Sequence, residues 1–415
     1  MNNKKWYLIA FVFLLITYTK LFEFRPAAEF FNKLLFVVFF ILLVFTLGNF
    51  SYKKGIFIKP IKYIIYSLFL AIIPCVMFWD QSLVQSFIAV APFSYFLLFL
   101  FLIKARINRE LIVKTILVCA YISLIAFTYQ FVFPETVLFG LKEEIIEDRG
   151  ISRIVFPAEG FMFFALFYYL NKLGRNFKLK YLLLFLPFFL MMLVQVTRMY
   201  YLAFGLIAIY HFMIKSKLLF RIVIISIFIF CYSFFYNSGN KTIEGIRNAN
   251  DVDVERKEDN IRLISATYFL FEFPKDPINY FLGSGAYNYN SSYGKKILNL
   301  NENEFFYLED IGILKGYVLF GVLFVLGYVL IFIKSFTMKI PHNQLYLQYF
   351  IWMILILSFT TRANTNAGFG VVLVSVLYLF ELAYLEQNNL IAAKSPGMLK
   401  RNFNPYKPSK NIKAT

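Results

Sequence analysis

Four arginines carry the clearest chemical signal in this sequence, because each stands at or next to the end of an apolar run. They are Arg149, Arg153, Arg198 and Arg362. A guanidinium group presents a planar, rigid fork of donors that matches the oxygens of a phosphate group. Several such groups converging at one surface would suit a diphosphate. The alternative for each arginine is that its side chain reaches lipid headgroups or pairs with a neighbouring carboxylate.

Carboxylates gather in two places along the chain. Residues 142–149 read Lys-Glu-Glu-Ile-Ile-Glu-Asp-Arg, which could supply a general base for a hydroxyl group or simply form a solvated loop. A second group precedes a later apolar run and consists of Glu302, Glu304, Glu309 and Asp310. For Glu309 and Asp310 the alternative is structural, since the helix dipole favours a carboxylate at the start of a helix.

Composition and charge place the chain in a membrane. Of 415 residues, 60% are apolar and 21% aromatic, whereas 16% are charged, which is too few for the surface of a soluble protein. The formal net charge of +18 could indicate nucleic-acid binding. The basic residues, however, form short clusters between apolar runs and no continuous stripe or arm. This spacing is typical of membrane topology, and we expect no nucleic-acid partner.

About twelve apolar runs approach the roughly 20 residues that a helix needs to cross a hydrocarbon core of about 30 Å. They predict an all-α polytopic membrane protein with transmembrane helices at residues 5–22, 31–49, 62–79, 84–103, 111–133, 154–171, 179–196, 199–214, 218–236, 311–333, 345–361 and 367–385. The segment before the first run lacks a small-x-small cleavage site after it, so we expect an uncleaved first helix.

The distribution of lysine and arginine predicts the topology, because these residues in short connections resist translocation. With twelve spans, the basic clusters fall on one side: Lys4/Lys5, Lys53/Lys54/Lys59, Lys104/Arg106/Arg109, Lys172/Arg175/Lys178/Lys180, Lys215/Lys217/Arg221, Lys334/Lys339 and Lys394/Lys400/Arg401/Lys407. Both termini are therefore predicted to be cytoplasmic. A long acidic connection then faces outward, as do Arg149, Arg153, Arg198 and Arg362.

The predicted organisation has four parts: residues 1–236 with nine spans, an extracytoplasmic loop at 237–310, residues 311–385 with three spans, and a basic cytoplasmic tail at 386–415. A loop of this length is more often functional than not. Inside it, Ile261, Ile264, Tyr268 and Phe271 recur at helical spacing, which predicts a short amphipathic helix on the outer membrane surface. The prolines of residues 274–277 should end that helix.

Several kinds of chemistry are disfavoured. The two histidines, His211 and His342, are both predicted on the cytoplasmic side, so no histidine relay would operate outside. The three cysteines lie inside apolar runs and show no metal or disulfide spacing. Residues 283–285 read Gly-Ser-Gly without the Gly-Lys-Ser/Thr of a P-loop, which disfavours an ATP-driven pump. We expect neither a metal nor a cofactor.

Three segments form a recognisable set. They are Arg198-Met199-Tyr200-Tyr201-Leu202-Ala203 at the start of a helix; Arg262, Pro277 and Phe281-Leu282-Gly283-Ser284-Gly285 in one outer loop; and Phe306-Tyr307-Leu308-Glu309-Asp310-Ile311-Gly312-Ile313-Leu314 leading into a helix with Phe320-Gly321. Together they resemble the superfamily of O-antigen polymerases and O-antigen ligases, from about residue 149 to residue 366.

This resemblance implies a GT-C-like membrane glycosyltransferase of the bacterial inner membrane. It would act at the outer face on undecaprenyl-diphosphate-linked oligosaccharides, without a nucleotide sugar. A polymerase moves the growing glycan from its lipid diphosphate to the non-reducing end of a new lipid-linked repeat unit, whereas a ligase moves it to lipid A-core. Such ligases typically carry a histidine before the helix that follows the long loop. This sequence has Asn301-Glu302-Asn303-Glu304 there, which favours the polymerase.

The expected roles follow from the resemblance and from the charge of a diphosphate leaving group. Arg198 would neutralise the charge that builds up as the glycosidic bond breaks. Glu309 or Asp310 would activate or orient the acceptor hydroxyl. The diphosphate-binding candidates are Arg149, Arg153, Arg262 and Arg362. Membrane lipids are expected partners, and the polymerase reading also admits a chain-length regulator.

A flippase or transporter of about twelve helices is the main rival from another class. Such proteins usually contain internal repeats and place ionisable or Gly/Pro-broken segments at the membrane midplane. Here no repeat is visible, and the predicted membrane interior is nearly free of charge. These features favour an enzyme at the interface.

Overall fold

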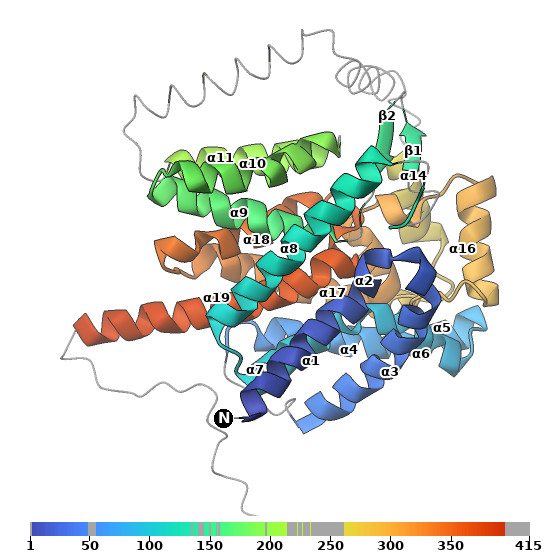
Figure 1. The fold of residues 1–415 in the computed structure, drawn as a ribbon. Helices are drawn as coiled ribbons and strands as arrows, with labels where there is room; N and C mark the ends of the chain where they lie inside the picture. Colours follow the sequence, from blue (N-terminus) through green and yellow to red (C-terminus); the bar gives the residue numbers. More distant parts are fainter. Residues whose placement is uncertain are drawn as a thin grey trace, which may run out of the picture.

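The computed structural model describes residues 2–48, 55–133, 136–139, 145–148, 151–154, 156, 158–195, 197–213, 222, 226, 233 and 261–394. Most of this part is helical (Figure 1). The helices are α1 (Asn2–Tyr18), α2 (Lys20–Glu23), α3 (Ala28–Leu47), α4 (Ile58–Leu70), α5 (Ile72–Trp79), α6 (Leu83–Val90), α7 (Leu97–Ala105), α8 (Arg109–Val132), α9 (Glu159–Arg175), α10 (Leu179–Val194), α11 (Arg198–Met213), α14 (Ile261–Thr267), α15 (Ile278–Leu282), α16 (Ser292–Asn303), α17 (Ile313–Thr337), α18 (Leu345–Leu357) and α19 (Ala367–Lys394).

One element departs from the all-α expectation. A short antiparallel hairpin, β1 (Ile145–Asp148) and β2 (Ile151–Ile154), occupies part of the connection between α8 and α9. It includes residues of the predicted acidic segment, and it shortens the sixth predicted span, because helix α9 begins at Glu159 and not at residue 154.

Six helical stretches in the described part are long and apolar enough to cross a membrane: Arg25–Leu47, Ile58–Trp79, Leu83–Ala105, Arg109–Val132, Ile313–Thr337 and Ala367–Asn388. Lys5–Tyr18 and Leu179–Val194 are apolar but shorter. This supports a multi-pass membrane protein. Helices α9, α11 and α18 also coincide with predicted spans, but they contain 17, 16 and 13 residues. The range 218–236 lies almost wholly outside the described residues, so twelve spans and a GT-C-like fold stay predictions.

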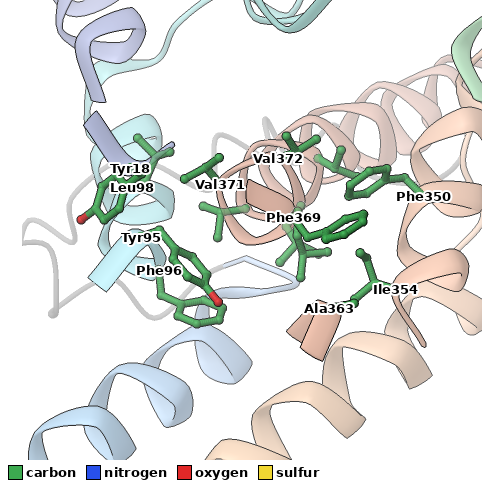
Figure 2. Close-up of a cluster of buried hydrophobic side chains, with 14 of the residues drawn as sticks. Tyr18, Tyr95, Phe96, Leu98, Phe350, Ile354, Ala363, Phe369, Val371 and Val372 are labelled. Atoms are coloured by element: carbon green, nitrogen blue, oxygen red, sulfur yellow. The ribbon is translucent and has the colours of Figure 1, made fainter. Parts of the chain in front are cut away.

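Helix α19 forms the centre of the bundle, since 83% of its most apolar stretch is buried. Its side chains pack against residues from the first and last thirds of the chain. Figure 2 shows this cluster, with Tyr18, Tyr95, Phe96, Leu98, Phe350, Ile354, Ala363, Phe369, Val371 and Val372 labelled. Aromatic rings dominate such contacts because they bury large apolar areas.

Helix α17 is interrupted at Gly321. Part of the long loop packs against α17 at this break. Gly321 has φ 74° and ψ −166°, a conformation that is accessible essentially only to glycine. The break frees the carbonyl groups of Val318 and Leu319 from their usual helical donors. They accept hydrogen bonds from the backbone N–H groups of Ser284 (2.7 Å) and Gly285 (2.9 Å). The Gly-Ser-Gly segment therefore docks inside the bundle against α17.

Four helices begin close together at one end of the bundle. The ring of Phe163 in α9 lies 4.8 Å from that of Tyr200 in α11 and 6.0 Å from that of Phe369 in α19. The backbone N–H of Ile313, the first residue of α17, donates to the carbonyl of Ser358 (2.7 Å), which follows α18 directly and begins the connection to α19. We call this the site end. The helix dipoles of α9, α11, α17 and α19 point their positive ends toward it.

Candidate functional site

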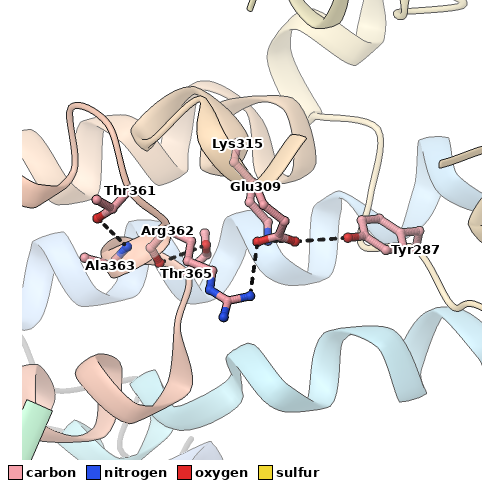
Figure 3. Close-up of polar contacts among 7 residues, drawn as sticks. All are labelled: Tyr287, Glu309, Lys315, Thr361, Arg362, Ala363 and Thr365. Atoms are coloured by element: carbon pink, nitrogen blue, oxygen red, sulfur yellow. Dashed lines mark hydrogen bonds and ion pairs between the residues drawn. The ribbon is translucent and has the colours of Figure 1, made fainter. Parts of the chain in front are cut away.

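The carboxylate of Glu309 is the centre of a charged cluster at the site end. Glu309 lies in the 3-10 turn Leu308–Asp310, immediately before α17. Its Oε1 atom is 2.5 Å from Nζ of Lys315 and accepts a hydrogen bond of 3.2 Å from the hydroxyl of Tyr287. Its Oε2 atom is 3.9 Å from Nη1 of Arg362. In Figure 3, Tyr287 extends from the long loop, Lys315 from α17 and Arg362 from the turn before α19.

Exposure differs sharply among the charged members of this cluster. The side chain of Lys315 is 8% exposed, that of Glu309 is 32% exposed and that of Arg362 is 40% exposed. Arg362 is therefore the cation of the cluster that solvent, or a ligand, can reach. The cations of Lys315 and Arg362 lie on either oxygen of the Glu309 carboxylate, so these three side chains together carry a net positive charge, which favours an anionic ligand.

Burial and the neighbouring charges determine the protonation states of Glu309 and Tyr287, which both lie outside the membrane-spanning helices. Burial raises the pKa of Glu309, but Lys315, Arg362 and the Tyr287 hydroxyl outweigh burial, so the pKa lies below its usual value of 4.5. Burial, followed by the charge of Glu309, raises the pKa of Tyr287 far above its usual value. At neutral pH the carboxylate is therefore ionised, and Tyr287 stays a protonated hydrogen-bond donor.

Arg362 begins the short 3-10 turn Arg362–Asn364, which lies between α18 and α19. The Asn364 carbonyl accepts hydrogen bonds from the hydroxyls of Tyr95 (3.2 Å) and Tyr328 (2.6 Å). These contacts hold the turn that carries Arg362.

Side chains of the same segment accept hydrogen bonds from backbone N–H groups before and at the start of α19. The side chain of Thr361 accepts a hydrogen bond from the backbone N–H of Ala363 (3.3 Å). The side chain of Asn366 accepts bonds from the backbone N–H groups of Gly368 (2.7 Å) and Phe369 (3.4 Å). Asn is a preferred cap for these otherwise unpaired donors. Arg362 is thereby placed one turn before a capped helix.

A second carboxylate, Glu159, lies at the site end on the first residue of α9. It is 5% exposed and accepts hydrogen bonds from the Tyr200 hydroxyl and from the backbone N–H of Phe156 (3.2 Å). Tyr200 is in the first turn of α11, which begins at Arg198. Arg198 is partly buried at this helix start. The bond from Tyr200 to Glu159 ties the start of α11, and with it Arg198, to the start of α9.

The structure brings together two of the residues that the sequence singled out, Glu309 and Arg362. Asp310 follows Glu309 and is exposed. Arg262 is exposed on α14, whose Ser265 accepts a hydrogen bond from the backbone N–H of Tyr307 (3.0 Å), close to Glu309. Arg153 lies on β2 opposite Ile146. Arg149 lies outside the described residues.

Two members of the cluster, Tyr287 and Lys315, were not anticipated from the sequence. Lys315 offered a signal, because a lysine within the first turn of an apolar span needs a partner. Tyr287 offered none, since it is one of 29 tyrosines and lies 22 residues before Glu309 in the chain.

The predicted amphipathic stripe of the long loop can be assessed only in part. Residues 261–272 form α14 and a following π-helical turn, Tyr268–Glu272. Ile261, Ile264 and Phe271 are exposed at 41%, 40% and 71%. The fourth predicted member, Tyr268, instead stacks on the ring of Phe306 with a centroid distance of 4.3 Å. The contact of the three exposed residues with the membrane stays a prediction.

Comparisons with models of known protein families and with curated proteins found no match. Among the described residues, no group of three or more His, Cys, Asp or Glu side chains could hold a metal ion. The charged groups of the site can bind an anion at Arg362 and can provide hydrogen bonding or proton acceptance at the carboxylates nearby.

Proposed function

We propose that this protein is a polymerase of undecaprenyl-diphosphate-linked oligosaccharide repeat units, a glycosyltransferase of the bacterial inner membrane. The observation that carries the proposal is the contact between Glu309 and Arg362 at the site end. There, an accessible guanidinium and a carboxylate stand side by side in a cluster with a net positive charge. A diphosphate donor and a hydroxyl acceptor require these two functions next to each other.

The reaction would be a displacement at the anomeric carbon of the donor glycan. The acceptor hydroxyl forms the new glycosidic bond, and the bond between the anomeric carbon and the diphosphate oxygen breaks. Its electron pair stays on the polyprenyl diphosphate, while the hydroxyl proton passes to a carboxylate or to water. Arg362 and Arg198 would bind the diphosphate oxygens and stabilise their growing charge, an effect of about 3 to 4 kcal/mol for one well-placed donor.

The lowered pKa of Glu309 refines the roles of the two carboxylates. A general base works best when its pKa lies near the operating pH, and the cations around Glu309 move its pKa in the opposite direction. Glu309 is therefore better suited to orienting Arg362. The exposed Asp310 is the better candidate for taking the proton.

The proposal includes a topology. The site end would face the periplasm, and the basic clusters at the other ends of the helices, together with both termini, would face the cytoplasm. A cysteine introduced near residue 290 should react with a membrane-impermeant reagent in intact cells, and one at residue 178 should not. The reverse pattern would remove the site from the compartment where the lipid-linked donor is used.

One observation favours a flippase or transporter as a second candidate. Helix α17 is broken at Gly321, and the stretch Leu83–Ala105 contains the 3-10 segment Ala91–Phe96. Broken helices within the membrane are typical of transporters. Deletion of the gene separates the two functions. Loss of a polymerase leaves single lipid-linked repeat units translocated but no ladder of longer glycans, whereas loss of a flippase leaves the units on the cytoplasmic leaflet. A normal ladder that fails to reach lipid A-core would indicate a ligase.

A further inference from the structure

Tyr289 presents an exposed aromatic ring next to the charged cluster. Its side chain is 58% exposed, and its ring packs edge-on against that of Tyr287, with a centroid distance of 5.3 Å. Tyr287 in turn donates its hydroxyl hydrogen bond to Glu309. Tyr289 is thus separated from the central carboxylate by one side chain.

The backbone that carries Tyr289 is firmly held. The buried side chain of Gln81 accepts hydrogen bonds from the backbone N–H of Asn288 (2.8 Å) and the hydroxyl of Ser291 (2.8 Å), and donates one to the carbonyl of Ala286 (2.9 Å). Residues on both sides of Tyr289 are therefore fixed to the turn between α5 and α6. Because this segment is already rigid, little conformational entropy is lost when the exposed ring binds a partner.

We propose that Tyr289 is a platform on which a sugar ring of the acceptor glycan stacks, so that an acceptor hydroxyl lies toward Glu309 and Asp310. One face of a pyranose ring is lined by C–H groups, which carry partial positive charge and pack favourably on the electron-rich face of an aromatic ring. Its hydroxyl groups project from the edge of the ring, and the residues that follow Tyr289 and Glu309 in the chain, Asn290 and Asp310, are exposed polar side chains. This inference rests on the proposed function, since it names the acceptor side of that site.

The experiment measures binding of one probe to the full-length protein in detergent. The probe is the oligosaccharide that mild acid releases from the lipid-linked repeat units of the host, so it carries neither lipid nor diphosphate. Isothermal titration gives its dissociation constant for the wild type, Tyr289→Ala, Tyr289→Phe and Phe271→Ala. Phe271 is a matched control, because it is a similarly exposed aromatic residue (71%) of the same loop that belongs to the α14 stripe.

Stacking predicts that Tyr289→Ala weakens binding about tenfold, which corresponds to about 1.4 kcal/mol, while Tyr289→Phe and Phe271→Ala stay within about twofold of the wild type. Unchanged binding by Tyr289→Ala would overturn this inference and leave the proposed function intact. An equal loss in Tyr289→Phe or Phe271→Ala would also overturn it, because the ring face of Tyr289 would not be the cause. Absence of binding by the wild type would count against both proposals.

Discussion

The ion pair between Lys315 and Glu309 makes a quantitative prediction about stability. Lys315→Met replaces a buried side chain by an apolar one of similar length, and leaves Glu309 with Tyr287 and with Arg362 at 3.9 Å. Removing one partner of a fully buried pair costs about 3 to 5 kcal/mol. Glu309 is one third exposed, so water screens part of that cost, and we expect about 2 kcal/mol.

Removal of the carboxylate should lower the free energy of unfolding more than removal of the ammonium. Glu309→Gln leaves the ammonium of Lys315, whose side chain is only 8% exposed, without its carboxylate, and we expect a loss of about 3 kcal/mol. The double variant removes both charges, so neither is stranded, and we expect about 2 kcal/mol in total. The coupling energy between the two positions would then be about 3 kcal/mol.

The assay is the rate of irreversible unfolding at a fixed temperature for the protein in lipid nanodiscs, because membrane proteins rarely unfold reversibly. If the pair is broken in the unfolding transition state, 2 kcal/mol corresponds to a rate about 30-fold faster. Lys33→Met is a matched control, since Lys33 forms an exposed ion pair with Glu29 and should change the rate little. Additive effects of Lys315→Met and Glu309→Gln would refute the arrangement of the cluster.

Three further predictions follow from single residues. Arg198→Lys and Arg198→Ala should both lose about a hundredfold in polymerisation at normal protein levels, because an ammonium cannot reproduce the fork; a normal glycan ladder from Arg198→Lys would restrict this residue to a structural role. Because its folded-state pKa is lowered from 4.5, Glu309 contributes stability at neutral pH that is lost as the pH falls below about 4.5. The thermal stability of Glu309→Gln should lack this acid-dependent loss. The same dependence of thermal stability on pH in the wild type and in Glu309→Gln would contradict this prediction. Gly321→Ala would place a Cβ against the backbone of Phe281–Gly283 at φ 74°, so the loop should become more sensitive to protease; unchanged cleavage would show that the docking is not needed to hold it.

The helices could largely be predicted from the sequence, for a physical reason. Backbone polar groups inside a membrane must be satisfied within their own segment, so a long apolar run leaves the helix as the main solution. The prediction of 111–133 corresponds to α8 at Arg109–Val132, and that of 367–385 lies within α19. The number of membrane crossings depends on whether helices of 13 to 17 residues cross the membrane.

The site could be predicted only in its parts. Charge type and position near helix ends were enough to select Glu309 and Arg362 separately. Their contact depends on the position of the turn before α19, which is held by hydrogen bonds from Tyr95 and Tyr328. These are tertiary contacts between segments more than 30 residues apart, and no local pattern encodes them. The packing of the Gly-Ser-Gly segment against the break in α17 could not be predicted from the sequence for the same reason.

We propose that this protein transfers glycan from one lipid diphosphate to another at Arg362. The most direct measurement uses the purified full-length protein in vesicles that contain only lipid-linked repeat units. The wild type should produce a ladder of glycans that grows by one repeat unit, with one polyprenyl diphosphate released per bond formed. Arg362→Ala, present at the same level, should lose about a hundredfold in rate. A wild-type protein that moves the units across the bilayer but forms no ladder would contradict the claim.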